Sequence, residues 1–401
     1  MLSIEKLKYG FSRIWEREYF WLGLLVLLVL ILHFSTIMQP AELVLDEKHY
    51  VEDARSIIER QDTFRPEHPP LGKLIIVSGI LMLGDNPLGW RFFSVIFGTL
   101  SIILFYLICR KLDMPREATI LATFLLALEN LSFVQAGVAM LDVYFFTLML
   151  GSFLLYLRER YEVSGILVGL SALAKLTGAL ALPAIVLHWL FTRRTRPHQI
   201  IITALMSIVS FLAIMPLFDF AVSGRWVSPI IRTATMLRLM GSLTFADATH
   251  EAVSRPWDWI IRPEIMAYWY EPNYVGAISF TVWALIIPSV FYMVFRARKG
   301  NDASIFGLSW FASNYLVWIP VSLIFDRVSF IYYFYPTVGA ICIGLGLGLS
   351  RLWGIWRTRE TGKLRWIARL AVAVYLLLHL IVFVILSPVF PIDLYWFSSW
   401  L

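Results

Sequence analysis

The sequence predicts an all-α polytopic membrane protein with about eleven transmembrane helices. Of its 401 residues 59% are hydrophobic, the mean hydropathy is +0.72, and apolar runs of about 20 residues recur along the whole chain. Charged residues make up 15% of the chain, against about 25% in an average soluble domain. A membrane β-barrel would instead show alternating segments of about ten residues. The composition therefore argues against both a soluble enzyme and a barrel.

Basic residues predict the orientation of the spans. Twenty-one of the 34 lysines and arginines fall into six clusters, and such clusters favour the cytoplasmic side. An even number of crossings must then separate each cluster from the next, and the N-terminus lies inside. The clusters are Lys6, Lys8, Arg13 and Arg17; Arg110, Lys111 and Arg116; Arg158 and Arg160; Arg193, Arg194 and Arg196; Arg296, Arg298 and Lys299; and six residues from Arg351 to Arg369.

The first interval between clusters contains three apolar runs, at 19–38, 71–84 and 89–109. Three crossings would break the parity. The middle run has 14 residues, about 21 Å of helix, which is too short for a hydrocarbon core of about 30 Å. We therefore expect an interfacial helix there, inside a first outer loop at 39–88. No small-residue cleavage site follows the run at 19–38, so we expect a retained anchor.

The segment 162–192 must leave and re-enter the cytoplasmic side within about 30 residues. This predicts two short helices that meet near the sequence AKLTG, with Lys175 at membrane depth. A lysine and irregular backbone are tolerated there only inside protein or in a wet cavity.

The remaining apolar runs complete one integral membrane domain over residues 1–401. We find no linker, internal repeat or separate soluble domain, and the C-terminus is expected outside. A second large outer loop covers 219–275, and interfacial helices are expected in the first and fourth outer loops. The other predicted spans are 116–133, 142–157, 199–218, 276–297, 304–324, 329–351 and 365–387.

The first outer loop carries a dense group of charges. Residues 41–71 include eight acidic and four basic side chains, and Asp46 and Glu47 follow the first span closely. Residues 48–60 have the periodicity of a short amphipathic helix. The following sequence RPEHPP is expected to be extended, because a residue before proline avoids the α region, and it would orient His68. A solvated acidic surface is the alternative for Asp46 and Glu47.

Four basic residues, Lys73, Arg91, Lys175 and Arg327, lie beside apolar runs on the predicted outer side. Lys73 falls in the first turn of the interfacial helix, where the helix dipole disfavours a cation unless an anion is near. Converging cations at this depth suit a lipid-linked phosphate. Side chains that extend to the interface are the alternative.

Several other polar and aromatic residues are candidates for the same site. Glu129 and Asp142 could cap helices or pair with a cation. The sequence from His250 to Trp257 and beyond is rich in aromatic residues, which suits a membrane interface or a sugar-stacking surface, and Tyr332 and Tyr333 follow Arg327. No His or Cys pair has metal-site spacing, and Cys109 and Cys342 lie in apolar runs as expected for packed thiols.

An ordered set of motifs resembles the protein O-mannosyltransferase family, a group of polytopic glycosyltransferases of the C superfamily. The resemblance runs from about residue 43 to the C-terminus. Its motifs are LDEKHYV, HPPLGK, DNPLGWRFFS, ENLSFVQAGVAMLD, ALAKLTG, SRPWDWI, WYEP and RVSFIYYFYP.

The resemblance implies transfer of mannose from a polyprenyl phosphate-mannose donor, dolichyl or undecaprenyl, to a Ser or Thr hydroxyl outside the cytoplasm, with inversion. It implies that Asp46 is catalytic with Glu47 beside it. Arg91 and Lys175, then Lys73 and Arg327, would contact the lipid phosphate. His68, Asp142, Glu129, Tyr332, Tyr333, His250 and Trp257 are further substrate-site candidates. A carboxylate suits removal of the hydroxyl proton, and preplaced cations suit the developing phosphate charge.

The chain departs from the family pattern at Ala136-Gly137, where the family has Ser-Arg, and it lacks the large soluble domain of eukaryotic members. We therefore expect a prokaryotic plasma-membrane enzyme. A glycan or lipid acceptor, as in the related aminoarabinose transferases, is the alternative; a transporter or a non-catalytic scaffold are the other rivals. No cofactor and no nucleic-acid partner are predicted, while a divalent metal and a dimer stay open.

Overall fold

The computed structural model describes residues 19–61, 63–192, 196–248, 250–269, 274–354 and 362–390. The basic residues before Tyr19, Arg193 and Arg194, part of the last basic cluster and the C-terminal residues fall outside these ranges, so the expectations that rest on them are not addressed. The described fold is helical, with one small antiparallel sheet in its second outer loop.

The first part of the chain forms three helices of 12 to 17 residues and one of 25 residues. Helix α2 is followed by α3, which is amphipathic, and by α4, which has 14 residues; its interfacial position stays a prediction. Asn86 caps the next helix, α5, by accepting hydrogen bonds from the backbone N–H groups of Leu88 and Gly89. The bounds are α2 Phe20–Thr36, α3 Glu47–Ile58, α4 Pro70–Leu83 and α5 Pro87–Lys111.

The predicted span 116–133 is broken. Helices α6 (Arg116–Ala127) and α7 (Asn130–Gly137) meet at an angle of 56°. Glu129 stabilises the break, because its carboxylate accepts hydrogen bonds from the backbone and hydroxyl groups of Ser132 at 2.7 and 2.8 Å and from the backbone N–H of Ser279 at 2.8 Å. The helix α8 (Leu141–Leu157) follows α7 and is buried along most of its length.

The predicted pair of short helices that meet near Lys175 is confirmed. Helix α9 (Tyr161–Ala174) ends before Lys175, the 3₁₀ helix η1 (Leu176–Leu180) follows, and α10 (Ala181–Thr192) returns. Gly165 and Gly169, one turn apart on α9, lie against the backbone of α11 (Pro197–Ser223), where a Cβ atom would clash. Small residues at this spacing allow close packing of membrane helices.

The second outer loop contains the one element that the all-α prediction missed. After α12 (Pro229–Gly241), η2 (Phe245–Asp247) and α13 (Asp258–Ile261), strands β1 (Ile265–Trp269) and β2 (Tyr274–Ala277) pair antiparallel. β2 therefore occupies the start of the predicted span 276–297, and that span is divided into α14 (Phe280–Trp283) and α15 (Ile286–Ala297). The strands are rich in aromatic and β-branched residues, which favour extended backbone.

The last described helices build the other half of the bundle. Residues Asp302–Phe325 form one apolar segment, in which a π-helical turn separates two α-helices. The central helix α18 is 89% buried over its most apolar window, whereas the equivalent windows of α11 and α19 are 22% buried. The bounds are α16 Asp302–Phe311, η3 Ala312–Leu316, α17 Trp318–Phe325, η4 Ile331–Phe334, α18 Tyr335–Gly354 and α19 Gly362–Leu386.

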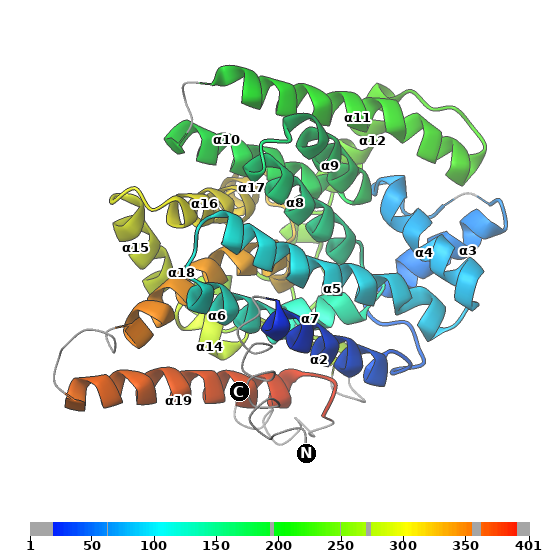
Figure 1. Ribbon diagram of the computed structural model, residues 1–401. Helices are drawn as coiled ribbons and strands as arrows, with labels where there is room; N and C mark the ends of the chain where they lie inside the picture. Colours follow the sequence, from blue (N-terminus) through cyan, green and yellow to red (C-terminus); the bar gives the residue numbers. More distant parts are fainter. Residues whose placement is uncertain are drawn as a thin grey trace, which may run out of the picture.

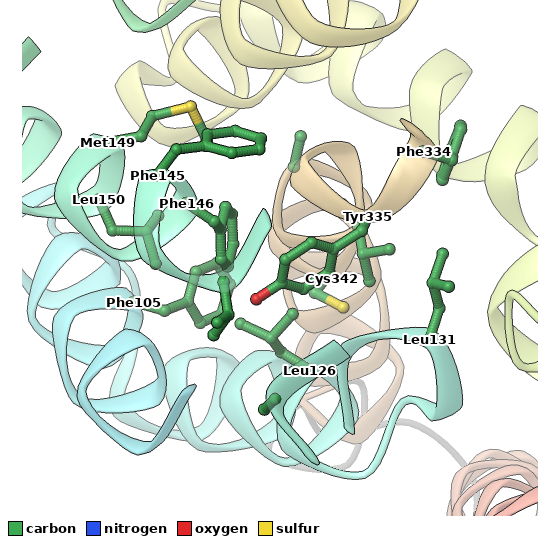
Figure 2. Packing of buried hydrophobic residues seen from close by; sticks show 14 of the residues in the cluster. Phe105, Leu126, Leu131, Phe145, Phe146, Met149, Leu150, Phe334, Tyr335 and Cys342 are labelled. Carbon is green, nitrogen blue, oxygen red and sulfur yellow. The ribbon is translucent and has the colours of Figure 1, made fainter. Parts of the chain in front are cut away.

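The long helices lie roughly parallel, with α11 and α19 at opposite edges of the bundle (Figure 1). Both edge helices expose large apolar side chains such as Leu205 and Leu377, as expected where a protein faces lipid. Between them, α5, α6, α8 and α18 interlock through side chains that include Phe105, Phe146 and Tyr335 (Figure 2). The fold is that of a polytopic membrane protein.

The number of spans stays a prediction. Among the described residues, five helices are long and apolar enough to cross a membrane, or six if α6 and α7 form one bent span. Six further apolar helices are shorter, and α4 is among them. The count of eleven is therefore not established by length and composition.

Candidate active site

A cavity of about 160 Å³ opens where the first outer loop meets the break after α9 and the segment before α18. Of the thirteen site candidates, seven line it: Asp46, His68, Asp142, Lys175, Arg327, Tyr332 and Tyr333. The other six do not line it; they are Glu47, Lys73, Arg91, Glu129, His250 and Trp257.

Asp46 lies at the junction between a strained turn and α3. The preceding residue, Leu45, has a φ of 44°, a left-handed conformation that costs an L-residue about 1–2 kcal/mol. Asp46 precedes the first residue of α3, but its side chain forms no capping hydrogen bond. The Tyr332 hydroxyl donates to Asp46 Oδ2 at 3.2 Å. The carboxylate therefore faces the cavity.

Glu47 and Arg91 form a buried clamp behind Asp46. The carboxylate accepts from Arg91 Nε at 2.9 Å and Nη2 at 2.8 Å, and also from the backbone N–H groups of Val44 at 3.1 Å and Ala139 at 2.9 Å. Arg91 uses its remaining donors on the backbone carbonyls of three residues: Ile37, Pro40 and Glu42. The Arg91 guanidinium, expected at the lipid phosphate, thus has every donor engaged within the protein and lies off the cavity wall.

Lys175 and Asp142 form the main ion pair on the cavity wall. Lys175 Nζ lies 2.8 Å from each carboxylate oxygen of Asp142. The ammonium group also lies 5.4 and 5.6 Å from the ring centroids of Tyr332 and Tyr333, within the range of cation–π attraction. Of the two roles expected for Asp142, capping or pairing with a cation, the structure shows the second.

The break that carries Lys175 depends on close backbone packing. Lys175 is extended, with φ −156° and ψ 136°, so its side chain leaves the helical surface of α9. A Cβ atom at Gly178 would clash with the backbone of Ser171. Because no side chain fits there, η1 folds tightly against α9 and holds Lys175 beside Asp142.

Arg327 is the cation of the cavity wall with no acidic partner among the described residues. Its Nη1 donates to the carbonyl of Met240, and its backbone forms an isolated bridge with Thr244. Two of its guanidinium nitrogens therefore keep donors for a ligand. Neighbouring Arg255 differs, because it pairs with Asp326 at 2.7 Å.

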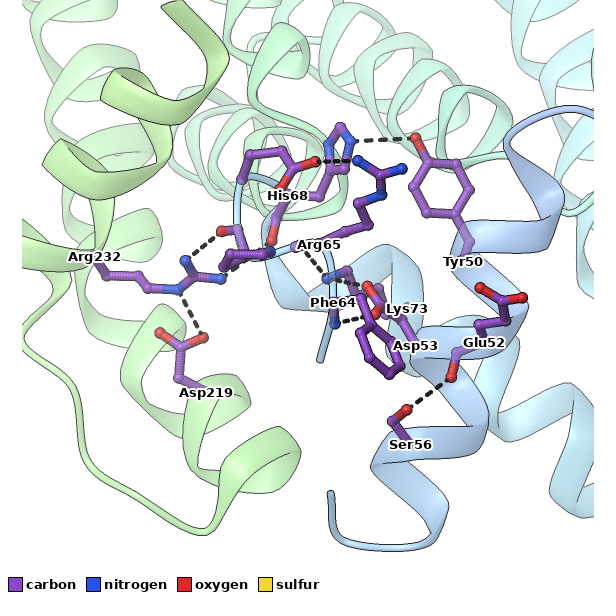
Figure 3. Close-up of polar contacts among 12 residues, drawn as sticks. Tyr50, Glu52, Asp53, Ser56, Phe64, Arg65, His68, Lys73, Asp219 and Arg232 are labelled. Carbon is purple, nitrogen blue, oxygen red and sulfur yellow. Dashed lines mark hydrogen bonds and ion pairs between the residues drawn. The ribbon is translucent and has the colours of Figure 1, made fainter. Parts of the chain in front are cut away.

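The segment carrying His68 is held by backbone contacts from three helices (Figure 3). From α4, Lys73 Nζ donates to the Arg65 carbonyl at 2.5 Å and pairs with Asp53 at 2.6 Å; Asp53 in turn accepts from Phe64 N at 2.7 Å. From α12, Arg232 donates to the carbonyls of Pro66 and His68. Lys73, also expected at the phosphate, thus anchors this segment instead of lining the cavity.

His68 presents its ring to the cavity in a positively charged setting. Its Nε2 and the Tyr50 hydroxyl are 3.3 Å apart, and the rings meet edge to face. Burial lowers the pKa of His68 well below its ordinary value of 6.5, and the charges of Lys175, Lys73 and Arg327 lower it further. His68 is therefore neutral at pH 7. Burial also raises the pKa of Tyr50 well above 10.0, with Asp46 adding to the effect.

His250 and Trp257 take local positions in the second outer loop. His250 is exposed, and its Nδ1 accepts from the backbone N–H of Ala252 at 3.1 Å. Trp257 begins α13 and lies near the Arg255 guanidinium, which is 5.8 Å from its ring centroid. The sequence allowed two roles for Glu129, capping a helix or pairing with a cation. In the structure its side chain caps the start of α7.

Several cavity residues were not among the sequence candidates. His49 and Tyr50 lie three and four residues after Asp46, so the helical spacing of α3 places them on the same face, a signal available in the sequence. Arg65 binds His49 Nε2 at 2.7 Å. Some of the others are close in sequence to a candidate: Glu67, Phe145, Thr177, Leu180, Phe330 and Pro336. The rest come from segments that held no candidate: Met240, Leu243, Asn314 and Trp318.

The departure at Ala136-Gly137 coincides with tight packing. A Cβ atom on Gly137 would clash with the Tyr274 hydroxyl of β2, and Gly98 of α5 lies directly against the Ala136 side chain. An arginine in this place would collide with β2. The small residues therefore let α7 pack between α5 and the sheet.

No group of three or more His, Cys, Asp or Glu side chains that could hold a metal ion occurs within the described ranges. Two carboxylates of the cavity differ in their partners: Asp142 pairs with Lys175, whereas Asp46 has only the Tyr332 hydroxyl as a side-chain hydrogen-bond partner among the described residues. The expectation of a reaction without a cofactor stays a prediction.

Comparison with known proteins identifies relatives of this chain. The sequence model of the family described as dolichyl-phosphate-mannose-protein mannosyltransferase matches residues 67–218. The polyprenol-phosphate-mannose–protein mannosyltransferase of Corynebacterium glutamicum is 23% identical, with 89% of this chain and 88% of that protein covered.

Solved structures share the fold. The S. cerevisiae protein O-mannosyltransferase Pmt1-Pmt2 complex bound to the sugar donor superposes with a TM-score of 0.77 at 12% identity, covering 100% of this chain and 93% of that one. ArnT from Cupriavidus metallidurans bound to undecaprenyl phosphate has a TM-score of 0.57 at 19% identity, covering 94% of this chain and 76% of that one.

Proposed function

We propose that the chain, which is similar to protein mannosyltransferases in sequence and in fold, moves mannose from a polyprenyl phosphate to a Ser or Thr hydroxyl of a protein. The observation that carries the proposal is that one cavity holds the Asp46 carboxylate together with the cations Lys175 and Arg327. A base and a phosphate-binding group are the two components that such a transfer needs.

Asp46 acts as the base in this proposal. The acceptor oxygen attacks the anomeric carbon of mannose while its proton passes to the Asp46 carboxylate. The bond from that carbon to the phosphate oxygen breaks, and its electron pair stays on the phosphate, so the sugar is inverted. The Tyr332 hydroxyl, which donates to Asp46 Oδ2 at 3.2 Å, fixes the direction of the carboxylate.

Lys175 and Arg327 stabilise the leaving phosphate. The phosphate gains negative charge as the bond breaks, and preplaced cations in a water-poor site favour that change most. Arg327 supplies the donors that no described protein group engages, and Lys175 supplies a charge already oriented by Asp142. The buried Glu47–Arg91 clamp holds the turn before Asp46 and does not touch the donor.

The reaction is assigned to the outer side of the membrane. Helix α5 begins beside the first outer loop and ends at Lys111, so the basic residues at its end lie about 37 Å from the loop by helix length. Arg296 and Arg351 border a cavity near Asp113, at that same end of the bundle, far from α3 and α4 (Figure 1). The positive-inside bias places this basic end in the cytoplasm.

The test is transfer by the purified full chain in detergent. It would be incubated with labelled polyprenyl phosphate-mannose and a Ser/Thr peptide, and the labelled peptide measured. Transfer that Asp46→Asn removes would support the proposal. Transfer to lipid or glycan acceptors but not to peptides would favour the aminoarabinose-transferase-like alternative, which the fold shared with ArnT keeps open. Solute uptake into liposomes without any sugar transfer would overturn both.

A further inference from the structure

A polar side chain lies in the middle of an apolar span beside the cavity. Asn314 belongs to the π-helical turn η3, between α16 and α17. Such turns insert an extra residue into a helix and occur frequently at functional sites. The side chain is 2% exposed and lines the cavity. A polar group at this depth is costly in a membrane protein, so its position calls for a partner.

The Asn314 amide is fixed, with its acceptor unused. Its Nδ2 donates to the Trp310 carbonyl at 3.3 Å and to Ser313 Oγ at 2.8 Å, both within its own helix. In the described part of the chain its Oδ1 accepts no hydrogen bond. The amide therefore offers the cavity one oriented acceptor.

Thr177 is a second lining residue with an unused polar atom. It lies two residues after Lys175, in η1, and its Oγ1 is buried with no hydrogen-bond partner among the described residues. A buried hydroxyl without a partner is unfavourable, and most such groups in native proteins find one. A ligand hydroxyl in the cavity would satisfy both Thr177 and Asn314.

Two aromatic rings complete the surroundings. Trp318 and Tyr333 both line the cavity, and their ring centroids are 4.7 Å apart at an interplanar angle of 39°. Aromatic faces pack against the C–H groups of a sugar ring, while amides and hydroxyls bind its hydroxyls. A polyprenyl chain has no hydroxyl group, and a phosphate needs donors instead of the Asn314 acceptor. The combination suits a hexose.

We propose that Asn314 and Thr177 form the subsite that recognises the sugar of the lipid-linked donor. The inference rests on the proposed function for the phosphate and acceptor, but it assigns a separate part of the cavity. With the phosphate at Lys175 and Arg327, hydrogen bonds that Asn314 Oδ1 accepts from a sugar hydroxyl and that Thr177 Oγ1 forms with another would orient the anomeric carbon toward Asp46. The two residues thereby determine which sugar is accepted.

The test compares two ligands on the full chain in detergent: polyprenyl phosphate-mannose and bare polyprenyl phosphate of the same chain length. Asn314→Leu keeps the side-chain volume but removes the acceptor, and Thr177→Val removes the hydroxyl. Each variant should bind the mannosylated lipid about tenfold more weakly than the parent chain, because each leaves a sugar hydroxyl unpaired. Binding of bare polyprenyl phosphate should stay within about twofold of the parent chain, which also shows that each variant is folded.

Two matched variants sharpen the comparison. Thr177→Ser keeps the hydroxyl and should bind the mannosylated lipid like the parent chain. Ser309→Ala removes a buried hydroxyl from the same span. The Ser309 Oγ donates to the Ile305 carbonyl, and Ser309 does not line the cavity. This variant should therefore leave the affinities for both lipids unchanged.

Equal weakening of both lipids by Asn314→Leu and Thr177→Val would overturn the subsite, because the residues would then serve the phosphate or the tail. Unchanged binding of the mannosylated lipid by both variants would overturn it as well. If the parent chain transferred no mannose but bound another sugar-linked polyprenyl phosphate in a way that depended on Asn314, the proposed function would fail while the subsite stood.

Discussion

The Glu47 carboxylate and the Arg91 guanidinium share two hydrogen bonds, at 2.9 and 2.8 Å, directly behind the catalytic candidate Asp46. Their side chains are 0% and 1% exposed, and neither lines the cavity. A buried carboxylate and guanidinium with all partners satisfied hold the first outer loop against α5 and the start of α8. The pair positions the site without contacting a substrate.

Breaking this pair should destabilise the protein. Arg91→Met leaves the Glu47 charge buried without its cation, and Glu47→Gln leaves the guanidinium similarly unpaired; the expected loss is about 3–5 kcal/mol of unfolding free energy. Thermal unfolding in detergent would measure it. The control is Arg55→Met, which breaks a half-exposed pair with Asp85 and should cost about 0–1 kcal/mol. If the Arg91→Met protein kept its stability and lost only donor affinity, Arg91 would be a phosphate-binding residue instead of a structural one.

Removing the Asp46 carboxylate should abolish transfer while sparing the donor. Asp46→Asn keeps the size of the side chain and its contact with Tyr332 but cannot take a proton. The transfer rate should fall by about 10²–10⁴-fold, the usual contribution of a general base. Single-turnover transfer and donor binding would be measured together. The control is Glu67→Gln, another cavity carboxylate, which should change the rate far less. Full activity in Asp46→Asn would place the base elsewhere.

Arg327 should contribute directly to donor affinity. Arg327→Gln removes a charge-assisted contact to the phosphate, worth about 1.5–3 kcal/mol, so the donor Kd should rise about 10- to 150-fold. Binding of bare polyprenyl phosphate should weaken as well, because the phosphate is common to both lipids. Arg255→Gln is the matched control, since Arg255 lies nearby but pairs with Asp326. Equal effects of the two variants would argue against a specific phosphate contact.

Lys175 should contribute both to the stability of the protein and to its affinity for the lipid donor. A double variant separates these two contributions. Lys175→Met alone leaves the Asp142 carboxylate buried and unpaired, so the protein should lose about 3–5 kcal/mol of unfolding free energy. Adding Asp142→Asn removes the unpaired charge and should restore most of that stability without restoring donor binding. Unfolding curves and lipid binding on the same samples would test this. Recovered binding in the double variant would show that Lys175 does not contact the phosphate.

His68 should make stability depend on pH on the acid side. Its pKa in the folded protein lies below the unfolded value of about 6.5, so between the two values the unfolded chain binds more protons. Stability therefore rises with pH there and falls as the pH drops below about 6.5, by at most about 1.4 kcal/mol per pH unit. His68→Gln should flatten this slope in Tm measurements from pH 7 to 5. An unchanged slope would mean that His68 is already protonated in the folded state.

Patterns within short stretches were predictable from the sequence. The 14-residue length of α4 and the break around Lys175 follow from local rules about span length and charge parity. The RPEHPP segment was predicted wrongly as extended: it forms a turn in which His68 N donates to the Arg65 carbonyl at 3.3 Å. The motifs also indicated which residues gather at the cavity, and Asp46, His68, Asp142, Lys175, Arg327, Tyr332 and Tyr333 do line it.

The sequence did not predict which of several similar charged residues reach the cavity. Four cations were expected at one phosphate, yet Arg91 and Lys73 have buried acidic partners, Glu47 and Asp53, and lie away from the cavity. The sheet in the second outer loop was also missed, because its aromatic residues are equally typical of a membrane interface. Nothing local marked Asn314, whose place on the wall comes from a π-helical turn.

The sequence by itself determined the class of protein, the positions of many apolar helices and the set of charged residues that lie beside apolar runs, because hydropathy and charge patterns act along the chain. Only the tertiary structure decided which of those charges are free. An ion pair such as Glu47–Arg91 joins residues 44 positions apart, and whether a cation is neutralised within the protein or left to a ligand depends on partners that packing alone brings within reach.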